Sequence, residues 1–197
     1  MLRPKNNKTK PRIKHRPFLK WAGGKFRLTD DLNRVFPKRK QCLIEPFVGA
    51  GSVFLNSHFE RYILADINPD LIHLFNIVKD DVEGYITACK PIFFAENANS
   101  AAYYYEKRRQ FNHSTDPFER SVLFLYLNRF GFNGLCRYNS KNEFNVPFGA
   151  YKNHYFPEDE LRYFAHKAQH AQFICADFQQ TFTLADKHCV IYCDPPY

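Results

Sequence analysis

The sequence predicts an α/β fold built on a parallel sheet, and three features in chain order lead to this prediction. Residues 42–45 form a short apolar segment that ends in a glutamate, and the turn Gly49-Ala50-Gly51 follows it. A helix is expected from Ser52 to about Phe59. A second apolar segment over 61–65 then ends at Asp66. A strand, a helix and a second strand in this order form a right-handed βαβ unit, which implies parallel strands.

The other elements are predicted from apolar spacing and from residues that interrupt helices. Residues 129–153 are rich in Gly, Asn, Phe and Tyr without a helical period, which indicates a functional loop or hairpin. The apolar run 189–193 is expected to form a buried strand. Helices are expected over 27–35, 69–79 and 101–111, from Asp116-Pro117 through Leu127, and over 157–170, with a strand over 172–175 and a short helix after it.

The composition favours one globular domain that carries an insertion. The chain has 197 residues, of which 45% are hydrophobic, enough for a single core. No apolar run reaches about 18 residues, so no membrane span is expected. No apolar signal core follows the basic start, so secretion is not expected. The six cysteines include no Cys-x-x-Cys pair and lie mostly in apolar runs, which favours buried reduced thiols in a cytosol over disulfides or zinc.

The net charge of +8 comes almost entirely from the first 16 residues. Seven of the 28 lysines and arginines lie there without any acid, which leaves 21 basic and 20 acidic residues in the rest of the chain. A basic arm of this kind gains affinity for nucleic-acid phosphates by releasing counterions. The charge alone is equally compatible with a flexible solubilising tail.

The segment Asp194-Pro195-Pro196-Tyr197 carries the most informative chemistry. It follows an apolar run, so its carboxylate is expected at the carboxyl end of a strand, where open α/β sheets bind ligands. The two prolines fix the backbone without offering donors, so carbonyls can face that crevice. The tyrosine offers a flat face for stacking. A carboxylate, a bare carbonyl and an aromatic face together suit an exocyclic amine on a planar base.

The glycine turn and a second acid predict a nucleoside site on the same edge of the sheet. Gly49 and Gly51 let the backbone approach a ligand closely. Asp66 lies 21 positions after Glu45, where a ribose-binding acid is expected. Phe54 stands where the third glycine of a pyrophosphate-binding loop would lie. This departure favours a nucleoside without phosphates.

Two other patterns are set aside. His166 and His170 have the i, i+4 spacing of a metal pair, but no acidic or cysteine ligand is spaced to complete a site. A solvated helix face is therefore expected there, and no metal is predicted. Gly23-Gly24-Lys25 lacks the upstream glycine and the Ser or Thr of a phosphate-binding P-loop.

Four segments together resemble the Dam-type DNA adenine-N6 methyltransferases (D12 class), which use S-adenosylmethionine and recognise GATC in double-stranded DNA. They are Phe18–Lys25, Glu45–Phe54, Ala65–Asn68 and Asp194–Tyr197. The resemblance implies a Rossmann-like methyltransferase sheet with an inserted, mostly helical DNA-recognition subdomain that carries a hairpin. The implied parts are a basic flexible arm over 1–16, a cofactor-binding catalytic domain over 17–78 and 157–197, and a target-recognition insertion over 79–156.

The resemblance also implies the site residues. The implied catalytic residues are Asp194, Pro195, Pro196 and Tyr197. The implied S-adenosylmethionine ligands are Trp21, Lys25, Glu45, Phe47, Gly49, Gly51, Asp66, Asp177, Phe178 and Asp194. The implied DNA contacts are Lys20, Arg129, Phe132, Asn133, Leu135, Arg137, Asn139 and Pro147.

Within the insertion, the resemblance assigns the DNA contacts different tasks. Arg137 and Leu135 contact the outer base pairs, and Pro147 contacts a thymine methyl group. Phe132 and Asn133 fill the gap that a flipped-out adenine leaves. These residue types fit the tasks, since arginine pairs with guanine, asparagine with adenine, and aromatic rings wedge into the stack.

The family's sheet has seven strands, of which this sequence supplies the first four. The chain is therefore expected to be a fragment or truncated form with reduced or no activity, and its last strand an apolar edge. Two other functions stay open, a non-catalytic GATC-binding module and an RNA or protein N-methyltransferase. A cytoplasmic enzyme of a bacterium or phage is expected. The sequence favours neither mismatch repair and replication control nor a partnership with a restriction nuclease, and leaves the oligomeric state open.

Overall fold

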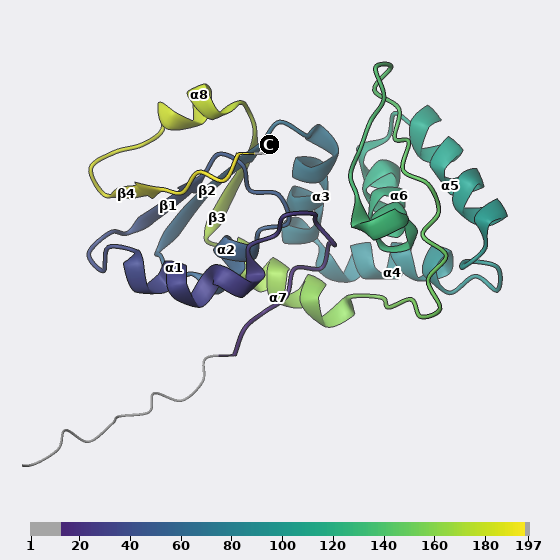
Figure 1. The fold of residues 1–197 in the computed structure, drawn as a ribbon, viewed down its shortest axis with the longest axis horizontal. Helices are drawn as coiled ribbons and strands as arrows, with labels where there is room; N and C mark the ends of the chain where they lie inside the picture. Colours follow the sequence, from purple (N-terminus) through teal and green to yellow (C-terminus); the bar gives the residue numbers. More distant parts are fainter. Residues whose placement is uncertain (1–12, 196–197) are drawn as a thin grey trace, which may run out of the picture.

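The computed structural model describes residues 13–195, and a sheet of four parallel strands lies at its centre (Figure 1). The strands are β1 (Cys42–Glu45), β2 (Arg61–Asp66), β3 (Ala171–Cys175) and β4 (Cys189–Ile191), in the spatial order β3-β2-β1-β4. Cys42 of β1 pairs with Arg61 on one side and with Cys189 on the other. The predicted α/β class with a parallel sheet is confirmed.

The helices form two groups on either side of α3 (Figure 1). One group lies along the sheet, and α4, α5 and α6 pack together beyond α3 with the loop that follows them. The bounds are η1 Phe26–Leu28, α1 Thr29–Val35, α2 Ser52–Asn56, α3 Pro69–Asp80, α4 Val82–Phe93, α5 Ala101–His113, α6 Pro117–Phe130, η2 Phe132–Gly134, α7 Glu158–Ala168 and α8 Phe178–Phe182.

The two faces of the sheet bury different clusters. Leu43 and Leu64 belong to the large core, in which Phe54, Phe75 and Phe164 from α2, α3 and α7 pack against the sheet. Cys42, Ile44 and Ile63 point to the other face and form a smaller cluster. Because successive strand side chains alternate between faces, Glu45 lies on the same side as Leu43, above α2. The Glu45 carboxyl group is therefore buried at the carboxyl end of β1.

Two helix starts follow standard capping rules. The Asn68 side chain accepts hydrogen bonds from two backbone N–H groups of α3, and the Asp116 side chain accepts one, from Phe118, at the start of α6. Each cap lies directly before a proline. The prediction of a helix starting at Asp116-Pro117 is confirmed. The α3 cap matters for function, because it lies two residues after Asp66.

Three element predictions differ from the structure. Helix α4 was not predicted, and Gly84 and Pro91 within it explain why its pattern is weak. Helix α2 ends at Asn56 rather than Phe59, since Ser57 is extended and its carbonyl accepts the Tyr62 hydroxyl at 2.9 Å. The run 189–193 is not a buried strand: β4 ends at Ile191, whose side chain is 41% exposed because β4 lies at the sheet edge.

The predicted part boundaries also differ in detail. Helix α3 runs through the boundary expected at residue 78. At the other boundary, the backbone N–H and C=O of His15 bond the Asn56 side chain, each at 2.9 Å, and the His15 ring stacks on Tyr163 at 3.4 Å. The arm expected over 1–16 therefore does not include His15, and its residues 1–12 lie outside the described part of the chain.

The hairpin of the insertion has little regular structure. Two isolated antiparallel bridges, Gly131 with Phe148 and Tyr138 with Phe144, join its sides. It packs on α6, which is buried from Ser121 to Phe130 except at Arg129. Within residues 13–195, the helices are too short or too polar to cross a membrane.

Candidate active site

A cleft of about 650 Å³ opens where the carboxyl ends of the strands meet. Glu45 and the turn after it come from β1, Asp66 ends β2, and Asp194 follows β4. This is the crevice in which open α/β sheets bind ligands. Of the predicted cofactor residues, those that line the cleft are Trp21, Lys25, Glu45, Phe47, Gly49, Asp66, Asp177, Phe178 and Asp194.

The turn after β1 brings bare backbone against the indole of Trp21. Gly49 has φ +49°, and a Cβ added to it would lie 2.8 Å from Trp21 Nε1. Only glycine fits this position without displacing the ring. The Gly49 N–H donates to Asp66 Oδ2 at 3.2 Å, so the turn is tied to the end of β2.

Asp66 is prepared by its surroundings to accept hydrogen bonds. Its Oδ1 accepts the backbone N–H of Asn68 at 3.0 Å. Burial raises the pKa of Asp66, while hydrogen bonds from Asn68, Gly49 and Ile67 oppose that rise. A carboxylate anchored by backbone donors at the edge of a cleft suits the hydroxyls of a ribose.

Glu45 is the most perturbed acid of the cleft. It is 2% exposed, and its Oε1 has no hydrogen-bond partner among the described residues. Burial raises the pKa of Glu45 to about 8, the backbone N–H of Phe54 opposes the rise, and Asp194 adds to it. The side chain is therefore neutral at pH 7 unless a cation enters the cleft.

Lys25 and Asp194 form an ion pair in the cleft. Lys25 Nζ lies 2.6 Å from Asp194 Oδ2 and also donates to the Gly23 carbonyl at 2.8 Å. Both side chains are about one quarter exposed, at 25% and 26%. Pro195 lines the cleft beside them, whereas Pro196 and Tyr197 lie outside the described residues. One oxygen of Asp194 is thus held by an ammonium group at the mouth of the cleft.

An aromatic pair closes the side of the cleft near β3. The rings of Phe47 and Phe178 stack with centroids 5.9 Å apart and an angle of 29°. Asp177 caps α8 by accepting the Gln180 N–H at 2.8 Å, and it is exposed. These residues could enclose a flat ring between a carboxylate and two aromatic faces.

Gly51 is the one predicted cofactor residue that does not line the cleft. It has φ +75° and immediately precedes α2, where it lets the chain turn into the helix. Conversely, the cleft includes Ser52, Ile67 and Tyr192, which sequence reasoning did not select. Two of these residues could have been selected by their nearness in sequence to predicted site residues. Ile67 directly follows Asp66, and Tyr192 lies two positions before Asp194.

Lys20 links the segment Phe18–Lys25 to the insertion. Asn128 bonds both the N–H and the C=O of Lys20, at 2.8 Å and 2.7 Å. Lys20 Nζ donates to the Arg129 carbonyl at 2.8 Å and lies 3.8 Å from the ring centre of Tyr151. Burial and the charge of Arg129 lower the pKa of Lys20 to about 8. The Arg129 guanidinium is itself partly buried, 5.4 Å from the Tyr155 ring.

The predicted DNA contacts of the hairpin lie on its outer surface. Phe132 is 48% exposed, and Asn133 has φ +54° with its N–H donating to the Tyr151 hydroxyl at 2.7 Å. Arg137 is exposed, and its Nε donates to Asn145 Oδ1 at 2.7 Å.

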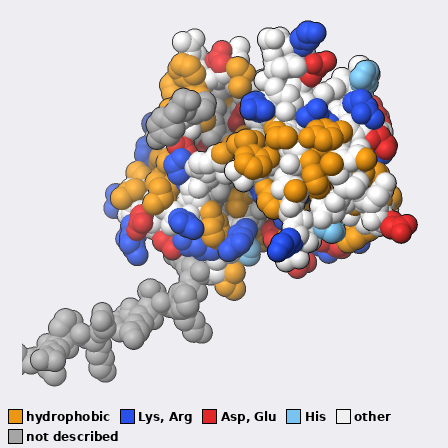
Figure 2. All heavy atoms as spheres, turned by 45° about the vertical axis from the view of Figure 1, so that its right-hand side comes forward, with side chains coloured by type: hydrophobic (Ala, Val, Ile, Leu, Met, Phe, Trp, Pro, Cys, Tyr) orange, Lys and Arg blue, Asp and Glu red, His pale blue; other side chains and the backbone are white. Residues whose placement is uncertain are grey.

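The other three predicted hairpin residues also have contacts within the loop. The Asn139 side chain accepts the N–H groups of Lys141 and Glu143, so it closes the hairpin tip. Pro147 is exposed, Leu135 is half-buried, and the Pro147 carbonyl accepts the Phe132 N–H at 2.9 Å. Figure 2 shows that Lys and Arg side chains surround exposed apolar side chains on this side of the molecule instead of forming one continuous basic field.

His166 and His170 are exposed, at the end of α7 and just beyond it. Among residues 13–195, no three or more His, Cys, Asp or Glu side chains gather closely enough to hold a metal ion.

The parallel sheet covered by helices, with a cleft at the carboxyl ends of its strands, has the fold of a Rossmann-like methyltransferase. Comparison with known proteins makes this more specific. The family model for the D12 class N6 adenine-specific DNA methyltransferases matches residues 21–197. The chain belongs to this family.

Named relatives agree with that assignment. The DNA adenine methylase of Haemophilus influenzae is 79% identical over 197 residues, which are all of this chain and 69% of that protein. The DNA adenine methylases of Escherichia coli K12 and Vibrio cholerae are 60% and 59% identical over 184 residues, which are 93% of this chain and 66% of each protein. The chain thus spans about two thirds of the length of these relatives.

Proposed function

We propose that this chain carries the site that transfers a methyl group from S-adenosylmethionine to N6 of adenine in double-stranded DNA, in the sequence GATC. The observation that carries the proposal is that Asp194 shares one cleft with Asp66 and Trp21, next to an exposed recognition hairpin. The relatives are named DNA adenine methylases, which supports the same reaction.

The residues of the cleft fit S-adenosylmethionine. Asp66 accepts the ribose hydroxyls, and the missing Cβ of Gly49 lets a flat base lie close to the backbone and to Trp21. Glu45 has a buried oxygen without a partner among the described residues, and a cationic group in the cleft compensates it. S-adenosylmethionine carries two such groups, an ammonium and a sulfonium.

The catalytic groups act mainly by position and charge. S-adenosylmethionine supplies a methyl group that is already activated, so the protein needs to align the attacking nitrogen. Asp194 accepts one N6–H and the Pro195 carbonyl accepts the other. These bonds direct the N6 lone pair towards the methyl group and stabilise the positive charge that develops on N6. Lys25 holds Oδ2 of Asp194 at 2.6 Å and so fixes the orientation of the carboxylate.

The hairpin prepares the base. N6 is out of reach inside a duplex, so the adenine must leave the stack. Phe132, which is 48% exposed, supplies an apolar wedge, and Asn133 fills the space beside it. Tyr197, whose structure lies outside the described residues, stacks on the extruded base.

The GATC preference rests on the exposed groups of the hairpin. Arg137 presents a guanidinium suited to O6 and N7 of guanine. Pro147 offers an exposed apolar surface to a thymine methyl group. Leu135 lies two residues before Arg137 in the sequence and contributes to the outer base pair.

The test is methyl transfer from labelled S-adenosylmethionine to a GATC duplex, against a matched duplex in which that adenine is replaced. Selective transfer to the first duplex is the expected result. Cofactor and DNA binding without transfer would favour a non-catalytic GATC-binding module. Transfer to RNA or protein that duplex DNA fails to compete away would favour the RNA or protein methyltransferase.

A further inference from the structure

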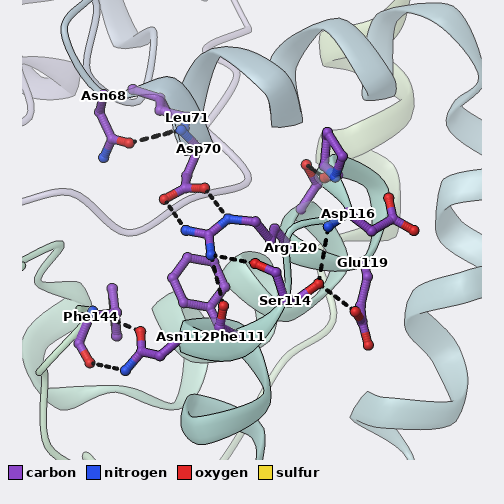
Figure 3. A network of polar contacts seen from close by, with 12 residues as sticks. Asn68, Asp70, Leu71, Phe111, Asn112, Ser114, Asp116, Glu119, Arg120 and Phe144 are labelled. Atoms are coloured by element: carbon purple, nitrogen blue, oxygen red, sulfur yellow. Dashed lines mark hydrogen bonds and ion pairs between the residues drawn. The ribbon is translucent and has the colours of Figure 1, made fainter. Parts of the chain in front are cut away.

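A single buried carboxylate joins the cleft to the recognition hairpin. Asp70 lies in the first turn of α3, four residues after Asp66, and is 6% exposed. Figure 3 shows it at the centre of a polar network that includes Asn68 before α3 and Arg120 from α6.

On the cleft side, the connection runs through the α3 cap. Asp66 Oδ1 accepts the Asn68 N–H, and Asn68 Oδ1 accepts the Asp70 N–H, each at 3.0 Å. The other oxygen of Asp66 accepts the Gly49 N–H at 3.2 Å. A ligand bonded to Asp66 is therefore separated from the first turn of α3 by two hydrogen bonds.

On the insertion side, Asp70 forms a bidentate ion pair with Arg120. Arg120 Nε donates to Oδ1 and Nη2 donates to Oδ2, both at 2.8 Å. Arg120 Nη1 donates to the carbonyls of Phe111 and Ser114, at 2.8 Å and 3.0 Å, so it also holds the end of α5. Paired donors of this kind fix orientation as well as distance.

Two further hydrogen bonds reach the side of the hairpin that carries Arg137. The Tyr138 hydroxyl donates to Asp70 Oδ2 at 2.7 Å, and Asn68 Nδ2 donates to Cys136 Sγ at 3.3 Å. Arg137 stands between these two anchored residues. Its backbone position thus depends on the same cap and carboxylate that contact Asp66.

The second side of the hairpin is held to α5. The Asn112 side chain donates to the Phe144 carbonyl at 3.1 Å and accepts the Phe144 N–H at 2.8 Å (Figure 3). Phe144 in turn pairs with Tyr138 across the hairpin. Because Arg120 connects α5 to Asp70, both sides of the hairpin are connected to the Asp70 carboxylate.

We infer that Asp70 is a positioning residue that couples occupancy of the cofactor cleft to the placement of Arg137, so that the chain binds GATC more tightly when the cleft is filled. This inference rests on the proposed function. A simple structural tie between two parts would stabilise the fold without making DNA affinity depend on the cofactor. Coupling is instead reciprocal, so DNA must raise cofactor affinity by the same factor.

The decisive variant is Tyr138→Phe, which removes the bond to Asp70 but keeps the ring that packs on Phe144 at 5.6 Å. The matched control is Tyr126→Phe, which also removes a buried hydroxyl bond, to the Ala98 carbonyl at 2.6 Å, away from Asp70 and the hairpin strand. For each chain, the Kd of a labelled GATC duplex is measured with and without S-adenosylhomocysteine. The ratio of the two values is the coupling factor.

We expect a coupling factor of about fivefold or more in the wild type and in Tyr126→Phe, and a factor near one in Tyr138→Phe. The affinity of Tyr138→Phe for S-adenosylhomocysteine alone should stay within about twofold of the wild type, because Tyr138 does not line the cleft. Asp70→Asn should also abolish the coupling. If that variant does not fold, Tyr138→Phe decides the question alone.

Two outcomes separate this inference from the proposed function. If the wild type binds both S-adenosylhomocysteine and GATC but shows a factor of one, or if Tyr138→Phe keeps the wild-type factor, the coupling role is overturned and the proposed function stands. If the wild type binds neither S-adenosylhomocysteine nor DNA, both fail.

Discussion

The cofactor cleft and the recognition hairpin are held in place by different means. The cleft takes its acids from the ends of parallel strands, so the backbone ladder positions Glu45 and Asp66. The hairpin has two isolated bridges among the described residues and a few backbone bonds across it, such as Asn145 N–H to the Arg137 carbonyl at 3.1 Å, and side chains supply many of its contacts with the helices. Tyr104 and Arg108 both donate to the Val146 carbonyl, at 3.0 Å each.

This difference predicts how the chemistry of the cleft and recognition by the hairpin respond to mutation. A backbone ladder tolerates side-chain changes, so the geometry of the cleft should be robust and its chemistry should depend on individual acids. A loop held by side chains loses its position when one of them is removed, so recognition should be the property that is easier to alter. The four predictions below test this contrast from both sides.

The largest effect is expected at the catalytic acid of the cleft. Asp194→Ala should lower methyl transfer to a GATC duplex by about 10²–10³-fold or more, because it removes the acceptor at the nitrogen where charge develops. Binding of S-adenosylhomocysteine should be largely retained. Single-turnover transfer and calorimetry measure the two properties. As a control, Asp186→Ala removes an exposed acid that pairs with Arg61 at 2.8 Å and should leave transfer unchanged. Retained activity in Asp194→Ala would refute the assignment.

The second-largest effect is expected on the pH dependence of the free energy of unfolding, through Glu45. Its pKa is raised to about 8 in the fold and is near 4.5 in an unfolded chain, so the fold binds the proton more tightly. The free energy of unfolding from this group is therefore fully present below about pH 4.5 and is lost as pH rises through about 8. Relative to Glu45→Gln, the ligand-free wild type should lose on the order of 3 kcal/mol between pH 5 and pH 9.

Urea denaturation at a series of pH values measures this difference. Glu96→Gln, at an exposed site, is the matched control and should follow the wild-type curve. Parallel curves for the wild type and Glu45→Gln would contradict the buried, neutral carboxyl.

On the hairpin side, Arg137→Ala should relax discrimination at one outer base pair. The expected loss is about 1–3 kcal/mol for that pair, with little change in the cofactor affinity of the cleft. Competition binding with duplexes altered at single positions measures it. Arg34→Ala on α1, which pairs with Asp31 on the surface, should keep the wild-type preference. Equal losses at every position would instead make Arg137 a phosphate contact.

The smallest effect compares two glycines of one turn. Gly49→Ala and Gly51→Ala both place a side chain at positive φ, +49° and +75°, and both should cost stability. Only Gly49→Ala pushes against Trp21, at 2.8 Å, whereas an alanine at position 51 meets Phe54 at an ordinary 3.5 Å. Gly49→Ala alone should therefore weaken S-adenosylhomocysteine binding, by about 3–10-fold, as expected for a displaced aromatic contact. Equal affinities for the two variants would speak against a cofactor contact at Gly49.

Much of the fold could be predicted, because its signals are local. The apolar runs ending in Glu45 and Asp66 predicted β1 and β2 almost to the residue, and the proline after Asp116 marked the start of α6. Helix α4 was missed, since glycine and proline in its end turns weaken its pattern and packing on α6 and α7 stabilises it. The expectation of an apolar edge strand is confirmed for β4, and only the burial expected for the run 189–193 was overestimated, because an edge strand exposes side chains such as Ile191.

The sequence predicted many of the residues in the candidate site, but few of the contacts between them. Resemblance selected about half of the residues that line the cleft, and it also selected Gly51, which lies outside that lining at the start of α2. Asp70 was not selected, because an acid after Asn68-Pro69 is what an ordinary helix start contains. Its importance comes from Arg120 and Tyr138, which lie 50 and 68 residues away in sequence.

The amino-acid sequence was sufficient to predict the strands and every long helix except α4, the glycine turn after β1, the acids at the strand ends and the family that these features resemble. These features depend on residues that are near neighbours in the chain. Only the tertiary structure decided that Lys25 pairs with Asp194, that Glu45 keeps an oxygen without a partner among the described residues, and that Asp70 ties the cleft to the hairpin. These depend on burial and on contacts between distant segments, which arise only when the chain packs.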